Sequence, residues 1–178
     1  MLADPRSSRV ILINPTRGDL WAAADLAARH IGLSLLQAGV EMFGVPSAIV
    51  GNYSPFNSRG IAQLVQSMTQ LDVDALSIWQ DRRFTDSLIS SETGIILFGG
   101  AWLEEEIFIA AIQGAERGYD VRVMSDLAQA RVNTDRSLVF DRLALHGILA
   151  TTVRQTLLEW AVSRDDPLLK QKVQQLWL

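Results

Sequence analysis

The residues of this 178-residue chain best suited to chemistry are three consecutive carboxylates, Glu104, Glu105 and Glu106. They follow an apolar run and the pair Gly99-Gly100, and they open a stretch whose apolar residues recur at helical spacing. Positioned carboxylates can act as a general acid, a general base or a nucleophile. At a helix start, however, the helix dipole favours their ionised form, which suits neither an acid nor a strong nucleophile. A charge-stabilised helix start is the alternative interpretation.

No other residue type offers a complete catalytic set. The chain has no cysteine, which excludes disulfides, thiolate metal sites and cysteine nucleophiles. Its two histidines, His30 and His146, give no metal-ligand spacing, so we predict no metal and no cofactor. No glycine-rich dinucleotide motif, phosphate-binding loop or serine nucleophile elbow is present.

The composition favours a well-packed globular domain, because 48% of the residues are hydrophobic and the mean hydropathy is +0.15. The net charge of −4 and the lack of a basic cluster argue against nucleic acid as a partner. No apolar run approaches the ~20 residues needed to cross a bilayer, and the N-terminus has no apolar signal region. We therefore expect a cytoplasmic protein with no membrane partner.

Short apolar runs alternate with helical patterns along the chain. The runs expected to form strands are Val10–Asn14, Val45–Val50, Ala75–Trp79, Ile95–Phe98, Val121–Met124 and Gly147–Thr152. The expected helices are Asp19–Ala38 (N-cap Asp19, ending at Gly39), Ile61–Leu71, Arg83–Ser90, Leu103–Gly118, Asp135–Leu145 (capped by Asp135) and Val153–Val162. The alternation predicts an α/β domain over residues 1–162, with three α/β/α layers around a six-stranded, mostly parallel, doubly wound sheet.

In such a sheet the first and fourth strands lie side by side, and ligands bind beyond their carboxyl ends. A crevice for a small-molecule ligand is therefore expected between Asn14–Asp19 and Gly99–Glu106, near the end of the third strand. The candidate pocket residues are Thr16, Arg17, Asp19, Trp79, Asp81, Gly100, Ala101, Trp102 and Glu105. Either tryptophan could stack on a ligand or fill the site.

The last residues, 163–178, form a distinct tail. Its apolar residues are Leu168, Leu169, Val173, Leu176, Trp177 and Leu178. An apolar face of this kind is not expected to remain in water. We expect it to dock on its own domain or on another subunit. We favour the second, which predicts a homo-oligomer of two or more chains.

Three segments carry a resemblance through their order and spacing. They are VILINPTRGDL (Val10–Leu20), GYDVRVMSD (Gly118–Asp126) and FDRLALHGI (Phe140–Ile148). They resemble, respectively, the first strand and loop, the strand after the nucleophile helix, and the penultimate helix and final strand of the isochorismatase-like hydrolases. This family, also called cysteine hydrolases, includes nicotinamidases and related amidases. The resemblance covers most of residues 10–160 and implies the family's α/β/α fold.

The family uses an Asp, a Lys and a Cys, and the resemblance indicates that this chain has lost all three. The Asp position matches Asn14, which cannot act as a carboxylate base. The Cys position matches Glu106, or Glu105 if the alignment slips by one. The Lys has no counterpart, because the only lysines are Lys170 and Lys172 in the tail.

Two features around the degenerate positions follow from the same resemblance. Trp102 replaces a small residue of the family pattern, so for this side chain we favour filling of the emptied site. The peptide joining Ala101 to Trp102 corresponds to one that is often cis in the family. A non-proline cis bond costs ~3 kcal/mol and is usually kept for function, which argues against it in a chain without the activity.

The leading hypothesis is a pseudoenzyme: an isochorismatase-like protein that has lost cysteine-hydrolase activity and serves as a non-catalytic binding or scaffolding subunit. Assembly with copies of itself and assembly with an active paralogue both remain open. The alternative is a divergent hydrolase of small amides or vinyl ethers that uses carboxylates and a water. In that case the base would be Glu106, Asp19 or Asp81, and Arg17 or Arg82 would be the electrostatic partner.

Overall fold

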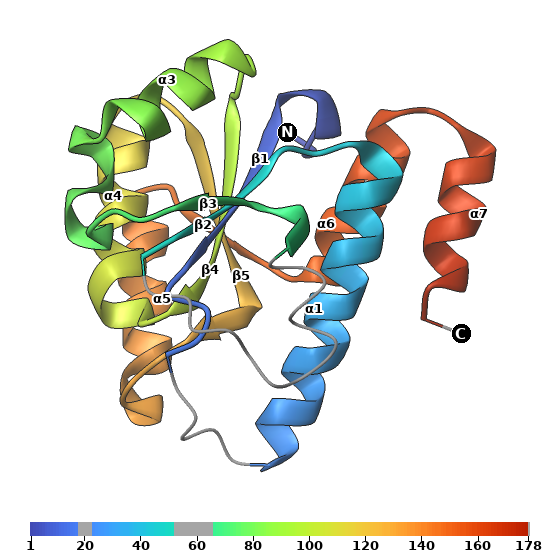
Figure 1. Ribbon diagram of the computed structural model, residues 1–178. Coiled ribbons are helices and arrows are strands. Elements are labelled where there is room, and N and C mark those ends of the chain that lie inside the picture. Colours follow the sequence, from blue (N-terminus) through green and yellow to red (C-terminus); the bar gives the residue numbers. More distant parts are fainter. Residues whose placement is uncertain (18–22, 52–65, 178) are drawn as a thin grey trace.

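The computed structural model describes residues 1–17, 23–51 and 66–177, and a six-stranded sheet lies at its centre (Figure 1). The strands are β1 (Ser8–Ile13), β2 (Ser47–Val50), β3 (Thr69–Leu71), β4 (Ile95–Ala101), β5 (Asp120–Gln129) and β6 (Leu149–Thr151). Their order is β3-β2-β1-β4-β5-β6, and every pairing is parallel. The predicted doubly wound sheet is confirmed, with β1 beside β4 where the strand order reverses.

Helices cover both faces of the sheet and give the expected three layers (Figure 1). One face packs against α3 (Arg82–Ser90), α4 (Phe108–Glu116) and α5 (Arg136–Leu145). The other packs against α1 (Ala23–Phe43) and α6 (Val153–Ser163), with α7 (Pro167–Gln175) alongside α6. The short helical turns are η1 (Pro5–Ser7), η2 (Ala75–Gln80), η3 (Leu103–Ile107) and η4 (Asn133–Asp135).

The central strands explain why the sequence pattern was informative. Every residue of β1 and every residue of β4 is buried. Strands of a parallel sheet that is covered on both faces have near-continuous apolar sequences rather than alternating ones. The runs Val10–Ile13 and Ile95–Phe98 have this character, and both predicted strands are confirmed.

The third strand was predicted in the wrong place. Ala75–Trp79 is not a strand but lies in η2, where the Asp74 carboxylate accepts a hydrogen bond from the N–H of Leu76. A short apolar run fits a buried strand and a buried helical turn equally well. The actual strand, β3, lies at the end of the segment Ile61–Leu71, which was predicted to be a helix. Residues 61–65 of that segment lie outside the described residues. Only one of its three residues is buried, so it has no apolar pattern.

One predicted helix boundary was also wrong. Gly39 does not end α1, which continues to Phe43. A Cβ on Gly39 would lie 2.0 Å from Leu157 Cδ2, so this glycine serves the close approach of α1 to α6. Asp135 is the N-cap residue of α5, as predicted, although its side chain makes no capping hydrogen bond there. The predicted cap of α1, Asp19, lies outside the described residues.

The tail contacts its own domain. Val173 of α7 is fully buried, and Leu176 and Trp177 pack against the core between the sheet and α6. The guanidinium of Arg154 lies 5.6 Å from the centre of the Trp177 ring. Leu168, at the start of α7, remains 67% exposed, so docking of the tail leaves part of its apolar face in solvent.

Asp126 lies in the irregular part of β5, where the register with β4 shifts. Its carboxylate accepts hydrogen bonds from the N–H of Val153 at 3.2 and 3.0 Å, at the start of α6. Burial raises the pKa of the Asp126 carboxyl above its ordinary value of 3.8, although the Val153 N–H and the charge of Arg136 act in the opposite direction.

This raised pKa makes the contribution of Asp126 to stability depend on pH. Between pH 3.8 and the higher native value the folded state binds more protons than the unfolded state, so this contribution is present at low pH and is lost as the pH rises. Asp126→Asn keeps an acceptor for Val153 but cannot ionise. We therefore expect the unfolding free energy of the variant, minus that of the unmodified protein, to increase between pH 4 and pH 7 in urea titrations. A constant difference would contradict the assignment.

Candidate functional site

The carboxyl ends of β1 and β4 bring Asn14 and Glu106 together, as the sequence predicted for these two positions. Ile13 pairs with Gly100 in the parallel register, and Asn14 follows directly at the strand end with a φ of 42°. The Asn14 side chain is buried, and its amide Nδ2 donates to Glu106 Oε1 at 3.4 Å. Gly51 makes room for it, because a Cβ there would lie 2.2 Å from Asn14 Oδ1.

Glu106 is held inward by the first turn after β4. This turn, η3, is a π-helical turn, and the N–H of Ile107 bonds to the carbonyl of Trp102. Glu106 Oε2 accepts the N–H of Trp102 at 3.3 Å, and Oε1 accepts Arg17 Nη1 in an ion pair. Both oxygens of a carboxylate that is 8% exposed therefore have partners. A buried charge requires this.

Arg17 reaches Glu106 from the loop after β1. The N–H of Arg17 bonds to the carbonyl of Asn14 at 3.0 Å, which folds the loop back over the strand end. Arg29 of α1 secures the same loop by donating to the carbonyl oxygen of Pro15. The Arg17 side chain itself is 36% exposed, so the ion pair has a buried carboxylate and a partly exposed guanidinium.

The other two glutamates of the acidic run face away from this pair. Glu104 Oε1 accepts the N–H groups of Arg131 and Val132 at 2.8 and 3.0 Å. Glu105 forms a two-pronged ion pair with Arg131, at 2.7 and 3.0 Å, and this carboxylate raises the pKa of the Arg131 guanidinium. These hydrogen bonds and this ion pair attach the segment after β5 to η3, the turn that precedes α4.

Trp102 is almost buried beneath this attachment. The guanidinium of Arg131 lies 5.2 Å from the centre of its ring, a cation–π contact. The bond between Ala101 and Trp102 is cis, so the argument against a cis bond at this position was wrong. Trp102 does not line the cavity described next. The cavity is therefore not filled by this ring.

A polar cavity of about 190 Å³ lies beside the Asn14–Glu106 pair, at the carboxyl ends of β1, β2 and β3. Within the part of the chain that the structure describes, the residues that line it are Asn14, Arg17, Gly51, Asp72, Val73, Asp74, Ala75 and Glu106. Three carboxylates and one guanidinium thus surround a space large enough for a small ligand.

Several residues predicted for the pocket lie elsewhere. Trp79 is a core residue whose Nε1 donates to the carbonyl of Ala110 at 2.9 Å. Asp81 caps α3 and pairs with Arg83, whose hydrogen bonds lower the pKa of this carboxyl. Both follow from the misplaced third strand. Thr16 is half-buried in the β1 loop, and Asp19 lies outside the described residues.

Gly100 and Ala101 contribute backbone rather than side chains. Both are fully buried where β4 ends. A Cβ on Gly100 would lie 1.8 Å from the carbonyl oxygen of Ile13, and its φ is +113°. The glycine therefore permits the close pairing of β4 and β1 directly beneath the site.

The sequence interpretation missed the other wall of the cavity, formed by Gly51 and residues 72–75. A usable signal was present, because Gly51 follows β2 and Asp72 follows β3, and carboxyl ends of parallel strands line such crevices. Because the third strand was predicted at Ala75–Trp79, the same rule placed Trp79 at the crevice instead of Asp72.

Two general features complete the site. Among the described residues, no three or more His, Asp or Glu side chains are grouped closely enough to hold a metal ion. Within the same ranges, no helix is both long and apolar enough to cross a membrane.

No family model matches the chain. The chain is 26% identical over 152 residues to proteins of Salmo salar and Danio rerio named isochorismatase domain-containing protein 1. The match covers 79% of this chain and 50% of each relative, so the chain spans about half the length of these curated relatives.

Solved structures share the whole fold. An octameric hydrolase of unknown specificity, YcaC from Escherichia coli, superposes with a TM-score of 0.79 at 16% identity, over 99% of this chain and 90% of that one. The MAR1 ribonuclease from Caenorhabditis elegans gives 0.80 at 17% identity, over 99% and 92%.

The sheet order and these similarities define a three-layer α/β/α fold, and the candidate site lies at its β1–β4 switch point. More particularly, the fold is isochorismatase-like, and the sequence is similar to those of proteins named for an isochorismatase domain. Because it contains no cysteine, it has no thiolate for the cysteine-hydrolase reaction.

The ion pair predicts non-additive effects on stability. Arg17→Met leaves Glu106 buried without its cation, and we expect a loss of about 2 kcal/mol, below the 3–5 kcal/mol of fully buried pairs because Arg17 is partly exposed. Glu106→Gln alone should cost under about 1 kcal/mol, since the guanidinium can be hydrated.

The double variant Arg17→Met/Glu106→Gln should recover most of the loss caused by Arg17→Met, as measured by urea unfolding. Arg82→Met, at an exposed position of α3, is the matched control and should be nearly neutral. Additive effects of the two substitutions would show that the pair is not coupled.

Proposed function

We propose that this protein is a non-catalytic binding or scaffolding subunit of isochorismatase-like fold. The observation that carries the proposal is the state of Glu106, which stands where the resemblance places the cysteine nucleophile. A nucleophile needs a free electron pair directed at its substrate. Glu106 instead has both oxygens engaged, by Arg17 and Asn14 on one side and by the Trp102 N–H on the other.

The cavity supports binding rather than scaffolding alone. It remains open beside the ion pair, and it is lined mainly by charged and polar side chains that could orient a small ligand.

The rival function, hydrolysis by a carboxylate and a water, has one observation in its favour. Glu106 borders a polar cavity with two further carboxylates, Asp72 and Asp74. Against it, Arg17 and Asn14 already bond to Oε1 and the Trp102 N–H bonds to Oε2, so each oxygen that could accept a proton from water is already engaged by other donors. The second candidate base, Asp81, is paired with Arg83 outside the cavity lining.

A screen of the purified protein on small amides, imides and vinyl ethers separates the two functions. We expect no turnover by the unmodified protein or by Glu106→Gln. Turnover that Glu106→Gln abolishes would establish carboxylate chemistry and overturn the proposal.

Glu106→Cys tests in the same experiment whether position 106 is still built for a nucleophile. The variant has a single thiol, because the natural chain has none. At a helix start beside Arg17, this thiol should titrate below about 8.5, the ordinary thiol pKa. We expect the rate at which this thiol reacts with iodoacetamide to reach half its maximum at a lower pH than the rate for the thiol of Ser90→Cys. Ser90 is an exposed position on α3 and serves as the control. Identical profiles would contradict the assignment of position 106.

We further propose that the chain forms a homo-oligomer through the surface of α6 and α7. Leu158 and Val162, four residues apart on α6, are 39% and 46% exposed, and Leu168 of α7 is 67% exposed. The YcaC structure of Escherichia coli is described as an octamer, which supports assembly as a property of this fold.

Charge at this surface should dissociate the oligomer. For Val162→Lys/Leu168→Lys we expect light scattering to give the mass of one chain, 19.7 kDa, while the unmodified protein gives a multiple of it. Ile89→Lys on α3, at a 72% exposed position of the opposite layer, is the control and should keep the larger mass. A mass of 19.7 kDa for the unmodified protein, or no change on substitution, would refute the proposal.

A further inference from the structure

The inner wall of the cavity already holds a guanidinium, that of Arg17. It is bonded to a carboxylate that is 8% exposed, and Asn14 Nδ2 and the N–H of Trp102 complete the surroundings of that carboxylate. Guanidinium and carboxylate are planar and match each other in charge and in hydrogen-bond direction. Glu106 with its fixed donors therefore forms a receptor for one planar cation, and the structure shows its occupant.

Arg17 is held less firmly than the buried arginines of this chain. Arg122 lies on a strand, is 3% exposed and pairs with both Asp120 and Glu159. Arg29 lies on a helix and is also 3% exposed. Arg17 lies on a loop, its side chain is 36% exposed, and Glu106 is the carboxylate with which it pairs. Its guanidinium can therefore leave the cavity while its backbone stays in place.

The rest of the cavity favours entry of another cation. Asp72 and Asp74 also line it, and the bonds to the Asp74 carboxylate come from neutral groups, the N–H of Leu76 and the hydroxyl of Ser77. The negative charge of Asp72 contributes to the raised pKa of the Arg83 guanidinium, but the carboxylate with which Arg83 forms its ion pair is that of Asp81. Among the described lining residues, three carboxylates stand against one guanidinium, and this excess of negative charge favours cations over anions.

The spacing of the carboxylates suits an organic cation better than a metal ion. Although three carboxylates surround the space, no group of three among the described residues converges closely enough to ligate one ion. Separated carboxylates suit a ligand that presents several N–H donors over a few ångströms.

We propose that Arg17 is an internal occupant of a guanidinium site and that a small ligand with a guanidinium or amidinium group displaces it to bind Glu106. The proposal rests on the binding function proposed above and names the chemical class of its ligand. Arg17 acts as an autoinhibitory side chain: it keeps Glu106 paired when the ligand is absent and lowers the affinity for the ligand by competition.

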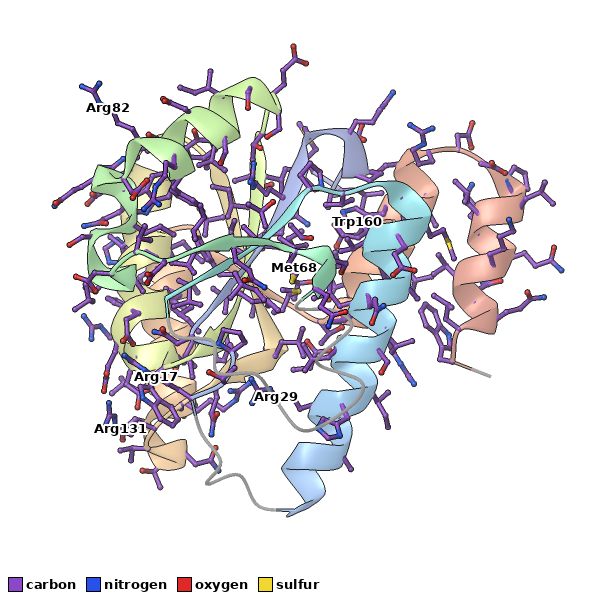
Figure 2. The ribbon with its side chains drawn as sticks, viewed as in Figure 1. Arg17, Arg29, Met68, Arg82, Arg131 and Trp160 are labelled. Carbon is purple, nitrogen blue, oxygen red and sulfur yellow. The ribbon has the colours of Figure 1, made fainter. Side chains whose placement is uncertain are left out.

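The first test measures binding of methylguanidinium by calorimetry. Arg17→Ala removes the internal competitor and opens space, so it should bind methylguanidinium at least tenfold more tightly than the unmodified protein. Arg82→Ala, which removes an arginine of α3 that lies well away from Arg17 (Figure 2), should bind as the unmodified protein does. Arg17→Ala/Glu106→Gln should lose the gain. Tetramethylammonium has the charge but no N–H donor. Its affinities for these proteins should therefore differ from one another by less than tenfold.

The second test uses the unmodified protein, so it does not depend on folding of a variant. The Nε–Hε signal of Arg17 in a ¹H–¹⁵N spectrum should move toward that of a solvated arginine as methylguanidinium is added. The signal of Arg82 should not move.

Two results would overturn the proposal. One is equal affinity of the unmodified protein and Arg17→Ala for methylguanidinium, and the other is binding that leaves the Arg17 signal unchanged. Neither would affect the proposed loss of catalysis, because that proposal is tested by turnover. Conversely, turnover that depends on Glu106 would refute the non-catalytic function even if methylguanidinium displaced Arg17.

Discussion

The close contact between β4 and β1 is the constraint on which the site depends. Gly100 has a positive φ of +113°, and a side chain there would lie 1.8 Å from the carbonyl oxygen of Ile13. Only glycine permits this approach. Because the strands pair in register at this point, the residue after β1 and the first turn after β4 emerge side by side. Asn14 and Glu106 meet for that reason, although 92 positions separate them in the sequence.

Sequence reasoning succeeded where burial leaves a continuous apolar pattern and failed where it does not. β1 and β4 are buried along their whole length, so their ends, and with them Asn14, Arg17 and Glu106, could be placed at one crevice. β3 has one buried residue and no such pattern, so the wall formed by Asp72 and Asp74 was missed. The apolar run that replaced it in the prediction folds as η2, because a short buried run does not specify its backbone.

The three adjacent glutamates have the same side chain but bind different partners, because each has a different position in the turn. As a charged helix start they would be interchangeable. In the structure Glu104 binds backbone N–H groups, Glu105 binds the side chain of Arg131, and Glu106 turns inward to Arg17. The helix-start interpretation therefore accounts for their common sign of charge, but the π-helical turn η3 decides which carboxylate becomes part of the site.

Exchange of a thiolate for a carboxylate changes what the electrostatics of this fold can do. A thiolate nucleophile is an anion kept free for attack, and its surroundings stabilise charge that moves during the reaction. Burial allows a carboxylate such as that of Glu106 only while its charge is neutralised and hydrogen-bonded. In the structure Arg17 provides the cation that neutralises it. Because Arg17 supplies that cation from a loop, with a third of its side chain in solvent, this ion pair is the contact that the proposed guanidinium ligand would have to replace.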